Sequence, residues 1–251
     1  MNVNLELTDH CNIRCRMCSQ SLRDEAHGAP MRFMDFETWR RGLAGLAGLP
    51  DVHLCPHWLG EPTLHPAFDG FVEYAFAVNG PNRLFQRFKL HTNAVILSPE
   101  RSRRLVRLAN APPGPASAAP GTFEAVHFSI DAATVASYAF VKGADHGERV
   151  FRNVARFIEL RGAAPFPVVH LTMVVQEGNR GDARAFVDRW TRVLSAANRS
   201  FRVTADWPPF DQDAIYLRRL NTGDQAGADA WHAQACRDVG LVGTARPPGS
   251  F

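Results

Sequence analysis

The stretch TDHCNIRCRMCSQ, from Thr8 to Gln20, places three of the chain's five cysteines within eight positions. Cys11, Cys15 and Cys18 follow the spacing C-x3-C-x2-C. Because the cysteine count is odd and three of the thiols are bunched, a disulfide framework is not expected. Bunched thiols in a reducing compartment predict a metal site.

Composition excludes several classes of protein. The chain has 251 residues, of which 45% are hydrophobic, enough to bury an ordinary globular core. A net charge of +3 is too small to indicate a nucleic-acid or acidic-membrane partner. The N-terminal MNVNLEL is neither a basic leader nor a signal-length apolar run, and no later run reaches membrane-spanning length. We therefore expect a soluble, cytoplasmic protein.

Short β-rich segments alternate with longer segments of helical period. The expected strands are 3–8, 52–58, 87–92, 125–130, 168–175 and 201–205. The expected helices are 36–49 after an Asp35 cap, 67–78, 100–109 after a Ser98 cap, 149–161 and 183–196. Six such units predict an α/β fold with a parallel sheet and outer helices. Periodicity alone leaves an open doubly wound sheet and a full or partial (β/α) barrel as alternatives.

Two segments break this alternation. APPGPASAAPG, residues 111–121, is typical of an exposed connector, and the tail TARPPGSF, residues 244–251, is typical of disorder. A last helical pattern spans 226–239. We therefore expect a core domain over residues 1–210 and a short C-terminal helical extension with a disordered tail over 211–251.

The cysteines lie on the loop after the first expected strand, and such loops carry ligands in α/β folds. Zinc sites usually need four protein ligands in two pairs, whereas this loop supplies three. A cubane iron–sulfur cluster held by three thiolates would keep one iron open to another ligand. Three buried structural cysteines, or a zinc loop completed by His10 or a distant residue, are the alternatives.

With this spacing after the first strand, the sequence resembles the radical S-adenosylmethionine (radical SAM) superfamily, whose core is a partial (β/α)6 TIM-type barrel. The resemblance implies one [4Fe–4S] cluster on Cys11, Cys15 and Cys18, with S-adenosylmethionine bound at the open iron. It also implies an external low-potential electron donor and a 5′-deoxyadenosyl radical that abstracts a substrate hydrogen atom. The substrate, a small molecule or a peptide, is not identified by the sequence, although peptide or natural-product modification is favoured.

Later segments resemble further motifs of the superfamily in the same order along the chain. Gly60, Glu61 and Pro62 in HWLGEPTLHP resemble the turn that meets the methionyl ammonium, with Leu59 at the position of a first glycine. In FKLHTNAVIL the polar pair Thr92 and Asn93 resembles a third-strand segment near the cofactor. Ala94 replaces a glycine there.

In VHFSIDA, Ser129 and Asp131 resemble the residues that hydrogen-bond the ribose hydroxyls. The fifth segment resembles one near adenine, with Gln176, Glu177 and Asn179 as weaker candidates. Met17 stands where the superfamily often has an aromatic residue, and it can still pack beside adenine. The resemblance covers residues 3 to about 205.

Histidines are unusual within buried parallel strands. His57, His91, His127 and His170 lie in four successive expected strands, and alternation places the first three on the faces of the motif residues that follow them. They form either a polar interior that binds substrate or a set of separate histidines bonded to backbone carbonyls. A histidine metal site is a third alternative.

Other residues leave further hypotheses open. Cys55 and Cys236 are too few for a second cluster and are expected to be buried thiols, with hydrogen-atom donation as an alternative. Trp58, Trp207 and Phe210 are expected in the core or at the barrel mouth. The competing functions are a non-catalytic iron–sulfur redox sensor or electron carrier on this scaffold, and a zinc-loop binding module.

Overall fold

A computed structural model describes residues 1–21, 32–112 and 122–241 of the chain. Within these residues one sheet of seven parallel strands has the order β1-β2-β3-β4-β5-β7-β6, with β1 and β6 at its open edges. The strands are β1 (Asn2–Asn4), β2 (His53–Cys55), β3 (Arg87–Thr92), β4 (Phe123–Ser129), β5 (Val168–Val175), β6 (Phe201–Thr204) and β7 (Asp213–Arg219). The expected α/β fold with a parallel sheet is confirmed.

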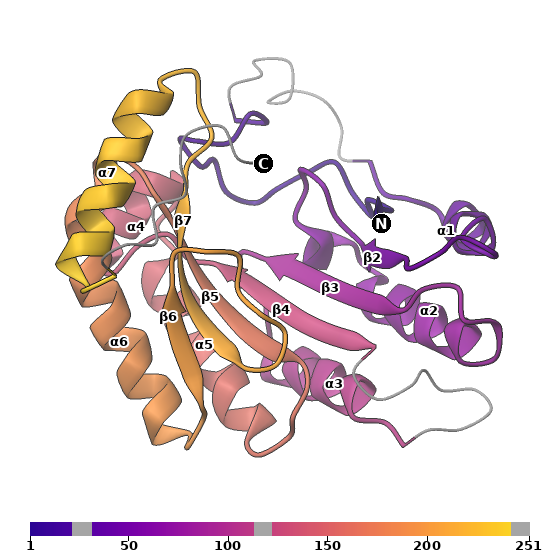
Figure 1. Cartoon of the computed structure of the whole chain (residues 1–251). Coiled ribbons are helices and arrows are strands. Elements are labelled where there is room, and N and C mark those ends of the chain that lie inside the picture. Colours follow the sequence, from indigo (N-terminus) through magenta and orange to yellow (C-terminus); the bar gives the residue numbers. More distant parts are fainter. Residues whose placement is uncertain (22–31, 113–121, 242–251) are drawn as a thin grey trace.

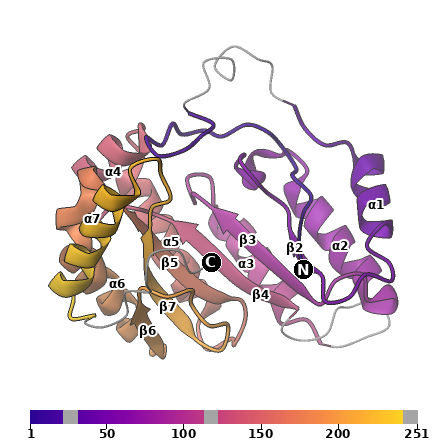
Figure 2. The ribbon, with the colours of Figure 1, turned by 45° about the horizontal axis from the view of Figure 1, so that its top comes forward.

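Helices alternate with the strands and lie around the outer side of the curved sheet (Figures 1 and 2). They are α1 (Phe36–Ala44), α2 (Phe68–Asn82), α3 (Pro99–Ala109), α4 (Val135–Lys142), α5 (Gly147–Arg161), α6 (Ala183–Ala196) and α7 (Gln225–Asp238). Both expected caps are confirmed, because Asp35 accepts from the Thr38 amide at 2.8 Å and Ser98 from the Arg101 amide at 3.1 Å. Among the helices of the described ranges, none combines the length and apolar character that crossing a membrane requires.

The two faces of the sheet differ in character. Val126 and Phe128 of β4 and Leu171 of β5 are fully buried in the hydrophobic core between the sheet and the helices. The alternate residues of these strands, His127 and His170 among them, lie on the opposite face, which we call the inner face. Polar side chains therefore line the inner face. The carboxyl ends of the strands form one edge of this face, which we call the carboxyl edge.

One strand and one helix were not predicted. Strand β7 pairs with both β5 and β6, so the sheet continues past residue 210 and the expected domain boundary falls inside the core. Helix α4 fills a segment between the fourth and fifth strands. The expected last helix corresponds to α7, whereas residues 113–121 of the connector and the whole tail lie outside the described residues.

Residues 205–212 join β6 to β7, two parallel neighbours, without a helix between them. This crossover, part of the orange segment in Figure 1, runs over the inner face. There the Pro209 carbonyl accepts a hydrogen bond from Nε2 of His170 at 3.0 Å, and the Phe210 ring lies 5.4 Å from the His170 ring. The inner face is therefore partly covered by the chain itself.

Candidate functional site

The cysteine loop follows β1 and is attached to the C-terminal end of α4. The amides of Arg14 and Arg16 donate to the carbonyls of Lys142 and Val141, each at 3.0 Å. Carbonyls in the last turn of a helix have no partner within the helix, so the loop satisfies them. The Arg16 guanidinium also donates to the Phe140 carbonyl at 2.9 Å and lies 3.8 Å from the centroid of its ring.

Two glycines allow other segments to approach this loop closely. A Cβ on Gly60 would lie 2.0 Å from the Thr8 carbonyl oxygen, and one on Gly143 would lie 2.4 Å from the Arg14 carbonyl oxygen. Gly143 also has a φ of 62°, which favours glycine. The loop is thus held between the turn after β2 and the end of α4 by backbone contacts that a side chain would block.

The three thiols of Cys11, Cys15 and Cys18 are free and partly buried. Burial, reinforced by the negative charge of Glu61, raises the pKa of Cys11 to about 12, so this thiol keeps its proton until a metal displaces it. Among the described residues no three His, Cys, Asp or Glu side chains converge on a point suited to one metal ion. Three thiolates supplied by one short loop are the donor type that iron–sulfur clusters use, whereas structural zinc sites usually take four protein ligands.

The Gly-Glu-Pro turn is held by a residue that the sequence did not single out. The carboxylate of Glu6 accepts from the amides of Trp58, Leu59 and Gly60 at 3.2, 2.6 and 2.7 Å. These three donors fix the main chain of the turn beside the cysteine loop. Glu6 lies between β1 and the cysteine loop, and this position could have indicated it.

Glu61 is 3% exposed, and both of its carboxylate oxygens have protein partners. One oxygen accepts from the amide and hydroxyl of Thr63 and from the Thr92 hydroxyl, the last at 2.7 Å. The other accepts from the Asn93 amide at 2.7 Å. Burial raises the pKa of Glu61 while these donors oppose the rise. Glu61 thus ties the ends of β2 and β3 together, and Pro62 begins the short 3-10 helix that follows it.

Asn93 contacts the cysteine loop directly. Its Nδ2 donates to Oδ1 of Asn12 at 2.7 Å and lies 3.6 Å from Sγ of Cys11. Its Oδ1 accepts from the Val95 amide at 3.0 Å, which orients the side chain. Asn93 therefore supports the first cysteine directly.

Asp131 has no exposed surface and pairs with Lys142, which is 1% exposed. The same carboxylate accepts from the Ser129 hydroxyl at 3.0 Å and, through Oδ1, from the Val174 amide at 2.7 Å. Burial lowers the pKa of Lys142, but the nearby negative charges of Asp131 and Cys15 outweigh it and raise the pKa overall. In this arrangement the Asp131 carboxylate contacts protein rather than facing an open site, whereas Ser129 is partly exposed.

A cavity of about 670 Å³ adjoins the cysteine loop. It is lined by Met17 of the loop, Phe140 of α4, Gln176 and Glu177 after β5, and Trp231 of α7. Nε2 of Gln176, a residue 8% exposed, is buried and has no partner among the described residues. The adenine-side candidates Gln176 and Glu177 therefore meet Met17, while Asn179 is turned away to bond the carbonyls of Asp131 and Val174.

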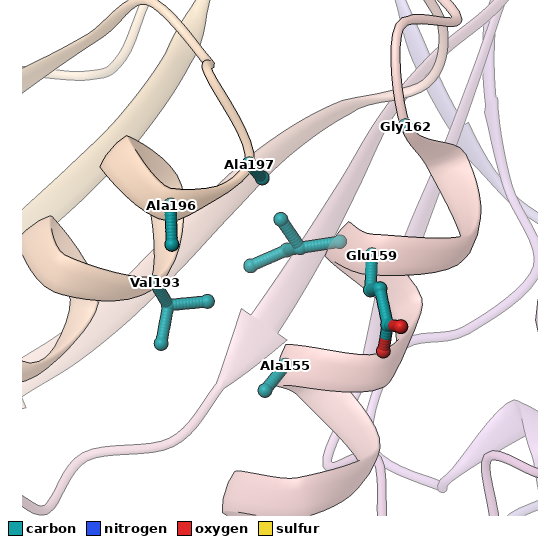
Figure 3. Close-up of a pocket in the computed structure, with 7 residues that line it drawn as sticks. Ala155, Glu159, Gly162, Val193, Ala196 and Ala197 are labelled. Atoms are coloured by element: carbon teal, nitrogen blue, oxygen red, sulfur yellow. The ribbon is translucent and has the colours of Figure 1, made fainter.

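A second, smaller cavity of about 310 Å³ lies in the helical layer (Figure 3). Ala155 and Glu159 of α5 face Val193 and Ala196 of α6 across it. Its lining is largely apolar and contains none of the expected site residues.

The sequence was compared with those of known proteins. No protein-family model matches the chain. Over 188 residues it is 29% identical to the GTP 3′,8-cyclase of Synechococcus sp. (strain CC9902), a match that covers 72% of this chain and 48% of that protein. The chain thus spans about half the length of this relative.

Solved structures show the same fold. Native anSMEcpe with bound AdoMet superimposes with a TM-score of 0.62 at 12% identity, covering 96% of this chain and 59% of that chain. The FeFe-hydrogenase maturase HydG from Carboxydothermus hydrogenoformans superimposes with a TM-score of 0.55 at 11% identity, covering 94% of this chain and 50% of that chain.

The fold and the cysteine loop define a partial-barrel α/β protein with a three-thiol site at the carboxyl edge of its sheet. A partial barrel is the fold that the resemblance to the radical SAM superfamily predicts, and the solved structures confirm that fold.

Proposed function

We propose that the chain is a radical SAM enzyme that binds one [4Fe–4S] cluster through Cys11, Cys15 and Cys18. The observation that carries the proposal is a loop of three partly buried thiols, fixed by backbone contacts at the carboxyl edge of a parallel sheet and adjoining a large cavity. Together, the cluster and S-adenosylmethionine supply a 5′-deoxyadenosyl radical able to abstract a hydrogen atom. The electrons come from an external low-potential donor, and the substrate is a small molecule or a peptide.

Each group of site residues has a proposed part. The main chain of Gly60, Glu61 and Pro62 addresses the methionyl end, because Glu6 and Thr8 hold that turn against the cysteine loop. Lys142 places a buried positive charge near Cys15 and offsets the negative charge of thiolate ligands.

Ser129 is partly exposed and addresses the ribose, and Asp131 acts through its hydrogen bond to Ser129 and its pair with Lys142. Asn93 addresses the ribose side as well as Cys11. The cavity beside Met17 takes the adenine, and Gln176 offers an unpartnered donor to a ring nitrogen. The five free thiols suit a reducing compartment, and we propose the cytoplasm.

The test is anaerobic reconstitution of the chain with iron and sulfide, followed by S-adenosylmethionine and a strong reductant. We expect about four irons per chain, a cluster EPR spectrum that changes when S-adenosylmethionine is added, and release of 5′-deoxyadenosine. Cys15→Ala should lose the cluster, whereas the matched variant Cys236→Ala, a buried thiol on α7, should keep it.

A cluster that neither responds to S-adenosylmethionine nor cleaves it would instead identify an electron carrier. A colourless protein with bound zinc would identify a zinc module. Either result contradicts the proposal.

A further inference from the structure

Four histidine rings lie side by side on the inner face. His91, His127 and His170 are cross-strand partners at one level of β3, β4 and β5, and His57 follows β2. The His57 and His91 rings stack at 4.5 Å between centroids, and those of His91 and His127 at 4.0 Å. The His127 and His170 rings meet edge to face at 4.4 Å. We call these four side chains the histidine layer.

The layer lies just below the proposed radical site. His91 and His127 precede Asn93 and Ser129 of the carboxyl edge by two residues, a rise of about 7 Å along a strand. His57 and His91 are partly exposed, so the layer can be reached from the inner face. A substrate that reacts at the edge would therefore contact these rings, an inference that rests on the proposed function.

All four rings are neutral at pH 7. Burial lowers the pKa of His57 and that of His170 to about 4. Burial likewise holds the pKa values of His91 and His127 well below the usual range, and the positive charge of Lys89 lowers both further. Each ring therefore presents one donor nitrogen and one acceptor nitrogen.

A chain of hydrogen bonds determines which nitrogen of His170 and of His127 carries the proton. Nε2 of His170 lies 3.0 Å from the Pro209 carbonyl, which can only accept, so the proton of His170 is on Nε2. Nδ1 of His170 must then accept, and its partner at 3.3 Å is Nδ1 of His127. The proton of His127 is therefore on Nδ1, and its Nε2 carries a lone pair. His127 is 3% exposed, and its Nε2 has no partner among the described residues.

We propose that Nε2 of His127 accepts a hydrogen bond from an uncharged hydroxyl or N–H group of the substrate. A buried acceptor without a partner is destabilising, and a ligand donor removes that penalty. A carboxylate or phosphate would bring its own lone pairs against that of Nε2 and is disfavoured. The histidine layer thus selects a neutral, donor-bearing group.

Trp207 of the crossover packs near the His127 ring. Its ring lies 5.4 Å from that of His127 and 6.1 Å from that of Tyr216, and the side chain is 51% exposed. Its indole nitrogen has no hydrogen bond within the described part of the chain, so ring contacts alone hold it. We infer that a ligand reaches the His127 ring when the Trp207 ring moves aside.

The experiment uses three para-substituted fluorobenzenes on the cluster-loaded protein: 4-fluorophenol, 4-fluoroanisole, which lacks the donor, and 4-fluorobenzoate, which is an anion. ¹⁹F NMR titration gives each dissociation constant. We expect 4-fluorophenol to bind about five- to tenfold more tightly than 4-fluoroanisole, the range of one neutral hydrogen bond. We expect 4-fluorobenzoate to bind more weakly than either.

Two variants of His127 distinguish the role of Nε2 from that of Nδ1. His127→Gln can place an amide oxygen near the position of Nε2, whereas His127→Asn reaches only the position of Nδ1. The preference for 4-fluorophenol should persist in His127→Gln and fall to about onefold in His127→Asn, with iron content and melting temperature as checks of folding. Trp207→Ala should tighten 4-fluorophenol binding and keep the preference.

Absence of binding, equal binding of phenol and anisole, tighter binding of benzoate, or an unchanged preference in His127→Asn would each overturn the inference. The readout does not depend on S-adenosylmethionine cleavage. Failure of cleavage with the preference intact would count against the proposed function alone, and cleavage without the preference would count against the histidine layer alone.

Discussion

Replacing Lys142 by Met would remove one partner of a fully buried ion pair. Lys142 is 1% exposed and Asp131 is 0% exposed, so the remaining carboxylate would have no access to water. Breaking a buried pair in this way usually destabilises a protein by about 3–5 kcal/mol. Ser129 and the Val174 amide would still donate to Asp131, which favours the lower part of that range.

The double variant Lys142→Met/Asp131→Asn removes both charges and leaves no unpaired ion. We expect it to be about 2 kcal/mol more stable than the sum of the single variants predicts. Urea unfolding of the three variants and the parent measures this coupling, provided that the m value stays constant. The carbonyl of residue 142 would still accept from the Arg14 amide, so Lys142→Met should retain the loop and its iron. Additive single effects, or a destabilisation below about 1 kcal/mol for Lys142→Met, would refute the reasoning.

Two further predictions use glycine and histidine positions. Gly60→Ala should lower the unfolding free energy by at least about 2 kcal/mol and reduce iron retention, because its Cβ would meet the Thr8 carbonyl oxygen at 2.0 Å. The control Gly70→Ala, on α2 with no atom within 4 Å of its Cβ, should gain about 0.5–1 kcal/mol in urea unfolding, and equal effects at both sites would contradict this. Burial lowers the pKa of His170 from 6.5 to about 4. This shift corresponds to about 3 kcal/mol of unfolding free energy that is lost between these two pH values. The unfolded state then binds more protons, so stability should fall as pH falls from 6.5 to 4, and a His170→Gln variant with the same pH slope would refute the assignment.

Local chemistry explains what the sequence predicted well. Strands β3 and β5 and helix α6 have the expected bounds, because apolar runs and caps are encoded by neighbouring residues. Helix α4 was missed because it is short and largely apolar on several sides, which gives no single stripe. The signal that could have found it is the capping box of Thr134 and Ser137.

Strand β7 depends on contacts that no local pattern shows. It follows two prolines and pairs between β5 and β6, out of chain order. The short apolar run from Ala214 to Leu217 is compatible with a buried strand, but the expected sixth strand at 201–205 had already completed the barrel. Only the paired sheet reveals that the core includes residues 213–219.

Residue types at the site were predicted better than their partners. Motif order placed Glu61 and Asp131 at the carboxyl edge, where the structure has them. Their hydrogen bonds come from Thr92 and Lys142, on other elements, and for Lys142 on the helix that was missed. The alternation of the histidines indicated a shared face, and the structure brings the rings into contact while also giving His170 a backbone carbonyl partner.

Helix α4 contacts both the cysteine loop and the end of β4. Its last carbonyls accept the amides of the cysteine loop, and Gly143 just beyond it permits the close approach of Arg14. The Lys142 ammonium, on the same turn, pairs with Asp131 at the end of β4. The position of the thiols and the charge beside them are therefore set by one turn of helix. That turn has a buried ion pair on one side and the loop amides on the other, and the loop amides bond to its main chain rather than to the Lys142 side chain. Helix α4 thus connects the three-thiol loop, through main-chain hydrogen bonds, to the sheet edge, through the Lys142–Asp131 pair.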